Sequence, residues 1–255
     1  MSVLRKSRMN LRENRKRHAF TLIEMLVVIG VIAILASITL GVITMAKSTS
    51  QEKRIQGQLN QLITAIEQYK SKVGFYPPDH QLKNALGNVM YTRYGKPQVN
   101  PVLNSLYYEL KGALVDISSE SFIAIGDPVE YALGQNQVEA WFGVNGISNS
   151  GKSEDAIKST FDGISESDVV LVSSSDIKSN TRPSGSVRLL SVPVSWPRQI
   201  QNKNPLGNTS INVWRYNSSN PTNNPASFDL WAEIPVKNKT TGDYELKIIG
   251  NWASE

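Results

Sequence analysis

A long apolar run, residues 20–46, constrains this chain more than any other feature. It holds 27 residues, FTLIEMLVVIGVIAILASITLGVITMA, and its one charged residue is Glu24. As a helix rising about 1.5 Å per residue, the run is about 40 Å long, against about 30 Å of bilayer hydrocarbon. We therefore expect residues 20–46 to form a transmembrane helix.

Basic residues gather in front of this run. Residues 1–19 contain seven of the 27 Lys and Arg residues and one of the 22 acids, a net charge of +6. The remainder carries 20 basic and 21 acidic residues, a net charge of −1, so we expect no nucleic-acid partner. The positive-inside rule keeps residues 1–19 in the cytoplasm and places the carboxy-terminal part outside it. Because the chain has no cysteine, a disulfide framework and a thiolate site are excluded.

The amphipathic pattern after residue 46 predicts that the helix continues to about residue 73. Apolar residues recur there at spacings of three and four. They are Ile55, Leu59, Leu62, Ile63, Ile66, Tyr69 and Val73. Gly74 followed by Pro77 and Pro78 is a strong stop signal for a helix. The apolar stripe then has to pack against the rest of the chain, with a separate helix pair or coiled coil as the alternative.

Beyond residue 74, short apolar runs separated by polar and glycine-rich segments predict strands and loops. The runs lie at 122–125, 138–144, 169–172 and 187–192. The expected fold class is α+β, a long amino-terminal helix packed on a small antiparallel sheet. The expected divisions are a leader (1–19), the transmembrane half of the helix (20–46), its amphipathic half (47–73) and an extracytoplasmic globular domain (74–255).

The stretch RKRHAFTLIEMLVVIGVIAIL, residues 15–35, resembles the amino-terminal signature of type IV pilins and type II secretion pseudopilins. The resemblance implies that a prepilin peptidase cuts the leader between Ala19 and Phe20 and that the new amino group of Phe20 is methylated. Glu24 then becomes the fifth mature residue. Ala19 stands where the family usually has glycine, and Gly41 stands where many type IV pilins have a kinking proline.

Two later stretches also resemble this family. The segment GFYPPDHQLKNAL, residues 74–86, is similar to the turn that leads from the long helix of pseudopilins into their globular domain. Residues 204–216, 228–231 and 248–252 resemble the closing part of the major (G-type) pseudopilin. The resemblance thus implies a pilin-like fold.

The implied function is structural. As a subunit of a type II secretion pseudopilus or a type IV pilus, the chain assembles into a filament and is not an enzyme. Glu24 then pairs with the amine of Phe20 in a neighbouring subunit, because an ionised carboxylate in an apolar helix is costly without a partner. The alternative for Glu24 alone is a side chain that reaches water at the membrane face.

The implied partners are other copies of the chain, other pilin-like subunits, prepilin peptidase, the inner-membrane assembly platform and membrane lipid. The expected location is the bacterial inner membrane, with a single span, a cytoplasmic amino terminus and a periplasmic domain. The alternative function is a single-pass membrane protein whose outer domain binds a ligand or nucleotide and does not polymerise.

One stretch satisfies the phosphate-loop pattern G-x-x-x-x-G-K-S, with Gly146, Gly151, Lys152 and Ser153 at its fixed positions. It follows the run at 138–144, read as a strand, and precedes a possible short helix at 154–161. Acidic residues directly after the pattern, the absence of repeated βαβ units and the expected location outside the cytoplasm argue against nucleotide binding. We expect no nucleotide here.

Metal and catalytic sites receive little support from the sequence. In the major pseudopilin subfamily, the loop between the closing strands binds calcium, and Asp243 and Glu245 are the candidate ligands here. Calcium needs six to eight oxygen ligands, and the neighbouring lysines disfavour it, so we expect no metal. His80 is the one histidine after residue 20, and it follows the Pro77-Pro78 turn. We expect it to be a solvated side chain rather than a base.

Overall fold

The computed structural model describes residues 21–178, 183–238 and 240–252, without the side chains of residues 38–48. The chain divides into two compact units, Met1–Thr49 and Ser50–Glu255, and each is described by itself. Ala19 and Phe20 lie outside the described residues.

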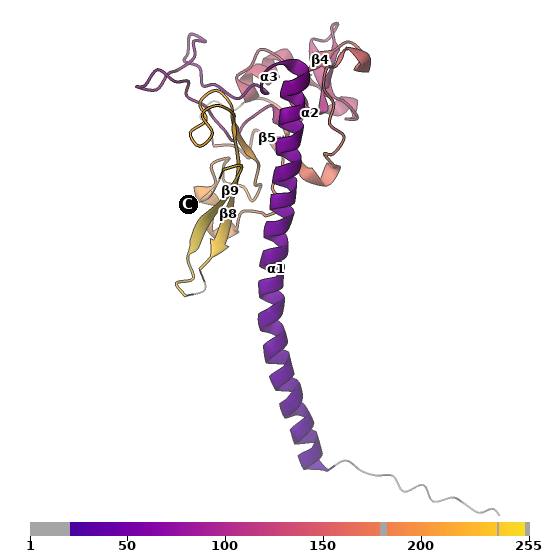
Figure 1. Cartoon of the computed structure of the whole chain (residues 1–255), viewed down its shortest axis with the longest axis vertical. Coiled ribbons are helices and arrows are strands. Elements are labelled where there is room, and N and C mark those ends of the chain that lie inside the picture. Colours follow the sequence, from indigo (N-terminus) through magenta and orange to yellow (C-terminus); the bar gives the residue numbers. More distant parts are fainter. Residues whose placement is uncertain (1–20, 179–182, 239, 253–255) are drawn as a thin grey trace, which may run out of the picture. The chain divides into compact units, whose positions relative to one another are not determined.

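The predicted long amino-terminal helix is present as a single helix, α1 (Leu22–Val73) (Figure 1). It ends where the sequence predicted, since Gly74 adopts φ 103° and donates its N–H to the Lys70 carbonyl at 2.8 Å. No helix in the described part of the chain is long and apolar enough to cross a membrane, which differs from the prediction for residues 20–46. Phe20 and the side chains of 38–48, which that prediction included, lie outside the description.

The second unit combines the carboxy-terminal part of α1 with short helices and strands. Its α-helices after α1 are α2 (Leu106–Lys111) and α3 (Gln135–Phe142). Its strands are β1 (Ala113–Asp116), β2 (Ser121–Ala124), β3 (Leu133–Gly134), β4 (Ser150–Gly151), β5 (Val169–Ser173), β6 (Ser186–Leu190), β7 (Arg215–Asn217), β8 (Asp229–Lys237) and β9 (Tyr244–Gly250). Short 3-10 helices lie at Val129–Tyr131, Glu154–Ala156, Glu166–Asp168 and Arg198–Lys203.

The strands of the described residues form three small sheets instead of the single sheet predicted. Their strand orders are β3-β2-β1-β4, β5-β6 and β7-β8-β9. All pairs are antiparallel except β1 with β4, where Ala113 lies opposite Ser150. The parallel pair is possible because the chain passes through β2, β3 and α3 before it returns as β4. The fold is therefore α+β, with an amino-terminal helix and mainly antiparallel sheets.

The run at 138–144 is a helix and not the strand that the sequence predicted. Val138, Trp141 and Phe142 are fully buried, and their spacing of three and four places them on one side of α3. Gly143 ends α3 in the left-handed conformation, with φ 67°. The runs at 122–125, 169–172 and 187–192 each hold most of a strand, β2, β5 and β6, as predicted.

The core of the second unit forms around one stripe of α1. Its members Ile55, Leu59, Leu62, Ile66 and Tyr69 are at most 2% exposed. They belong to one apolar cluster with residues of α2, α3 and all three sheets. The stripe thus packs against the globular part of the chain, and the alternative of a separate helix pair is not needed.

Candidate functional site

The first turn of α1 holds Glu24 in a local hydrogen-bonded arrangement. The Glu24 carboxylate oxygen Oε2 accepts hydrogen bonds from the Thr21 N–H at 2.8 Å and from the Thr21 hydroxyl at 2.7 Å. In return, the Glu24 N–H donates to Thr21 Oγ1 at 3.3 Å. This reciprocal arrangement is the capping box of a helix amino terminus. The T-x-x-E spacing of residues 21–24 is the sequence signal of this box, and neither expectation for Glu24, pairing with an amine or exposure to water, included it.

The first turns of α1 expose apolar side chains on all sides of the helix. Every large apolar side chain from residue 22 to 34 is between 48% and 83% exposed. They are Leu22, Ile23, Met25, Leu26, Val27, Val28, Ile29, Val31, Ile32 and Ile34. A helix that is apolar on all sides is ordinarily buried in an apolar environment. This segment therefore needs a cover that the chain's own described residues do not supply.

The phosphate-loop pattern does not have the geometry that its sequence requires. The segment before it is α3, β4 lies inside it, and a single 3-10 turn, Glu154–Ala156, follows it. A phosphate loop instead joins a strand to the start of a helix. The expected helix at 154–161 is thus reduced to three residues, and the motif lacks the helix amino terminus that would face a phosphate.

The backbone amides of this loop already hold an anion, the chain's own Glu109. Ser148 N donates to Glu109 Oε1 at 2.8 Å, and Asn149 N donates to Oε2 at 3.0 Å. Lys152 and Ser153 are exposed and do not line the neighbouring cavity, whereas Gly146 does. The structure therefore separates the residues that nucleotide binding would bring together.

Glu109 is a buried carboxylate that no sequence motif indicated. It lies on α2 with 0% exposure, and the Tyr69 hydroxyl on α1 donates to its Oε2 at 2.8 Å. Burial raises the pKa of Glu109 to about 7, while the bonds from Ser148, Tyr69 and Asn149 oppose that rise. Glu109 thus joins α1, α2 and the loop before β4 through one side chain.

The calcium candidates Asp243 and Glu245 lie at the β8–β9 turn. Glu245 Oε1 accepts a hydrogen bond from Asn238 Nδ2 at 2.7 Å, and the Asp243 carbonyl accepts one from Asn238 N at 2.7 Å. The described residues contain no group of three or more His, Cys, Asp or Glu side chains that could hold a metal ion. The turn is therefore organised by Asn238 in this structure.

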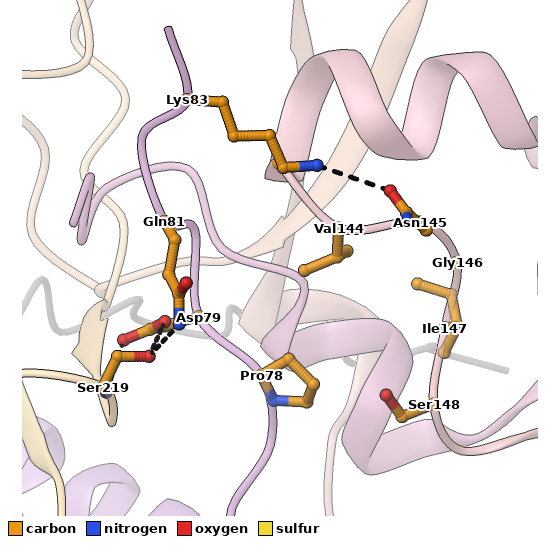
Figure 2. Close-up of a pocket in the computed structure, with 11 residues that line it drawn as sticks. Pro78, Asp79, Gln81, Lys83, Val144, Asn145, Gly146, Ile147, Ser148 and Ser219 are labelled. Atoms are coloured by element: carbon orange, nitrogen blue, oxygen red, sulfur yellow. Dashed lines mark hydrogen bonds between the residues drawn. The ribbon is translucent and has the colours of Figure 1, made fainter. Parts of the chain in front are cut away.

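A cavity of about 500 Å³ opens next to Asp79, Lys83 and residues 143–148 (Figure 2). Asp79 accepts hydrogen bonds from Ser218 N at 2.9 Å, Ser219 N at 2.8 Å and Ser219 Oγ at 2.6 Å. Lys83 Nζ lies 3.1 Å from Glu139 Oε1 and 3.4 Å from Asn145 Oδ1. The charged groups of the cavity are thus engaged by their neighbours and hold the surrounding loops in place.

His80 is half-buried, which corrects the expectation of a solvated side chain. Its Nδ1 lies 3.0 Å from the Leu103 carbonyl oxygen. Burial lowers the pKa of His80, so the ring is neutral at pH 7. In this position the ring ties the segment after Pro78 to the loop before α2.

Comparison with known proteins finds a match for the amino-terminal part of the chain. The sequence model of the family described as "Prokaryotic N-terminal methylation motif" matches residues 14–40. That range contains Ala19, Phe20 and Glu24 and the start of α1. No curated protein and no solved structure matches the chain. The motif implies processing by a prepilin peptidase, and it supports a place for this chain among the type IV pilin-like proteins.

Proposed function

We propose that this chain is a structural subunit of a type II secretion pseudopilus or a type IV pilus. The observation that carries the proposal is the methylation motif at residues 14–40. In this proposal a prepilin peptidase removes residues 1–19, the amine of Phe20 is methylated, and the mature chains assemble with one another and with other pilin-like subunits. Asp79 and Lys83 at the cavity of Figure 2 are engaged by neighbouring residues, which supports a structural role for these two side chains.

The exposed apolar turns of α1 supply the physical reason for assembly. Residues 22–34 present apolar side chains on every side of the helix, and such a surface is unfavourable in water at about 25 cal/mol per Å². Equivalent helices of neighbouring subunits would cover it in a filament. Before assembly, lipid of the inner membrane would do so, with the amino terminus in the cytoplasm. This membrane location rests on the motif and on the positive charge of residues 1–19.

The first experiment measures the intact mass and the amino-terminal peptide of the protein purified from the producing bacteria. We expect the chain to begin at a methylated Phe20. An assembled form that retains Met1 or Ser2 would contradict leader removal and with it the proposed function.

The second experiment separates two roles of Glu24. Glutamine at the third position of a capping box preserves the cap, so Glu24→Gln keeps the helix start but removes the charge. If the carboxylate neutralises the Phe20 amine of a neighbour, that amine is left buried and unpaired, at a cost of about 3–5 kcal/mol per contact. We expect Glu24→Gln to lose sheared filaments while leader removal and membrane-bound protein remain, and Glu24→Asp to be intermediate.

Thr21→Ala is the matched control, because it breaks the cap and keeps the carboxylate. A lost cap costs about 1 kcal/mol, so this variant should still assemble. Equal filament yields from Glu24→Gln and the unsubstituted chain would refute the pairing. A loss in Thr21→Ala equal to that in Glu24→Gln would mean that disturbing the helix start is enough to stop assembly, and the pairing would then have no support from Glu24→Gln.

A further inference from the structure

Residues 81–99, called the arm below, follow α1 in the second unit. Three short segments of it pair through isolated bridges, Gln81 with Val99, Lys83 with Val89 and Tyr91 with Pro97. Their middle residues close a ring of backbone hydrogen bonds. Leu82 N donates to the Gln98 carbonyl at 2.8 Å, Gln98 N to Met90 at 2.9 Å, and Met90 N to Leu82 at 2.8 Å. The arm is therefore held by its own backbone.

The arm carries two turns of the same design. In 84–88 and 92–96, the side-chain oxygen of the first residue accepts from the N–H groups of the third and fifth residues. The fourth residue is a glycine with positive φ, 79° at Gly87 and 73° at Gly95. The third residue is a large apolar side chain, Leu86 at 85% exposure and Tyr94 at 73%. Two equivalent turns thus present an apolar side chain to solvent, as a docking surface does.

Every charged residue of the arm is basic. Residues 81–99 contain Lys83, Arg93 and Lys96 and no acid. Arg93 and Lys96 are exposed, and neither forms an ion pair within the described part of the chain. The Arg93 guanidinium lies 4.6 Å from the centre of the Tyr94 ring, so the cation and the apolar anchor form one surface.

The segment 113–168, which contains the four-stranded sheet, has the opposite charge. It holds ten acids and two lysines. At the β1–β2 turn, Asp116 and Glu120 are exposed on either side of Ile117, which is 58% exposed. Hydrogen bonds from Ser118 and Ser119 lower the pKa of Asp116 to about 2, so its charge persists. We call residues 116–120 the acidic turn. It places an apolar side chain beside carboxylates, whereas the arm places an apolar side chain beside cations.

We propose that the arm of one copy docks on the acidic turn of the next copy, in a head-to-tail contact. The inference rests on the proposed function and names the interface between neighbouring globular units. Figure 1 shows the arm (violet) and the sheet that contains β4 on opposite sides of the carboxyl end of α1. Two different surfaces on opposite sides of one chain form a heterologous contact, and such contacts repeat along a polar filament. The opposite charges steer the encounter and fix its register.

Cysteine cross-linking tests the contact in full-length chains in the producing bacteria, because the natural sequence has no cysteine. A chain with both Tyr94→Cys and Ile117→Cys should form a ladder of disulfide-linked oligomers under mild oxidation. Each single variant should give no disulfide-linked oligomers. The control chain with Tyr94→Cys and Thr240→Cys, whose second cysteine lies on the β8–β9 turn, should give none either. Products that link the new cysteine of Tyr94→Cys to another protein, or a dimer from either single variant, would overturn the proposal.

Charge reversal supplies a second test on the same filaments. We expect Arg93→Glu with Lys96→Glu to lower sheared-filament yield by about tenfold or more, and Asp116→Lys with Glu120→Lys to do the same. All four substitutions in one chain should restore the yield, because every copy then carries both reversed surfaces. If filament yield falls in both charge-reversed chains and the chain with all four substitutions does not recover it, the contact is refuted.

The two proposals fail separately. Filaments that assemble but give no ladder would overturn the arm contact and leave the proposed function standing. If the unsubstituted chain forms no filaments and keeps its leader, the proposed function fails and the arm contact fails with it.

Discussion

The buried carboxylate of Glu109 gives the sharpest prediction about stability. Its two oxygens accept three hydrogen bonds, from Tyr69 Oη, Ser148 N and Asn149 N, at 2.8–3.0 Å. Glu109→Gln replaces one of these oxygens with an NH₂ group, which cannot accept. The Tyr69 hydroxyl can rotate to accept instead, but a backbone N–H cannot, so a buried amide loses its partner. That loss costs about 1–3 kcal/mol.

The same substitution removes a pH dependence whose sign follows from the pKa. Burial raises the pKa of Glu109 from 4.5 to about 7, so the folded chain holds this proton more tightly than the unfolded chain. The resulting stability is fully present below pH 4.5 and is lost as the pH rises through 7. Between about pH 5 and pH 8 the loss is about 2–3 kcal/mol.

Urea denaturation of the purified full chain at about pH 5 and pH 8, followed by tryptophan fluorescence, measures both effects. We expect Glu109→Gln to be the less stable protein at the lower pH, and its deficit to shrink by about 2–3 kcal/mol at the higher pH. Glu139→Gln is the control, because Glu139 is half-exposed in its pair with Lys83 and should change stability by less than about 1 kcal/mol at either pH. A Glu109→Gln deficit that is the same at both pH values would refute the reasoning.

Two further substitutions test the loops of the second unit, with thermal unfolding as the measurement. Gly143→Ala should lower the free energy of unfolding by about 2–4 kcal/mol, because the position has φ 67° and the new Cβ would lie 2.6 Å from His80 Cδ2; a loss below about 0.5 kcal/mol would contradict the described end of α3. Asp229→Ala should cost about 3 kcal/mol and make the segment 222–224 sensitive to proteases, because Asp229 accepts the N–H groups of all three residues. Unchanged protease resistance would show that the segment is held by other contacts.

Local patterns in the sequence were sufficient for α1 and its end. The stripe from Ile55 to Tyr69 repeats at the helical period, and Gly74 before two prolines stops the helix whatever packs on it. The strands β5 and β6 were predictable for a related reason, because each lies in a largely apolar run bounded by turn residues, whereas β8 and β9 were expected from the resemblance to pseudopilins.

The run at 138–144 shows where such patterns fail. A short apolar run fits either a buried strand or a buried helix, and periodicity alone does not separate the two. The choice was made by contacts distant in sequence, since Val138, Trp141 and Phe142 fill one side of the core as α3. The order of three short sheets, with β4 parallel to β1, likewise depends on pairings between segments that are far apart in the chain.

The candidate site divides in the same way. The methylation motif, with Ala19, Phe20 and Glu24, could be read from the sequence because the processing enzyme acts on a linear segment. The contacts of Glu109 and the exposed surface of the arm could not, because they depend on which groups share a buried space or an exposed face. The phosphate-loop pattern shows the physical reason. Its residues match a nucleotide site, but folding brings Glu109 against its amides, and the free energy of a buried carboxylate is set by those neighbours in space.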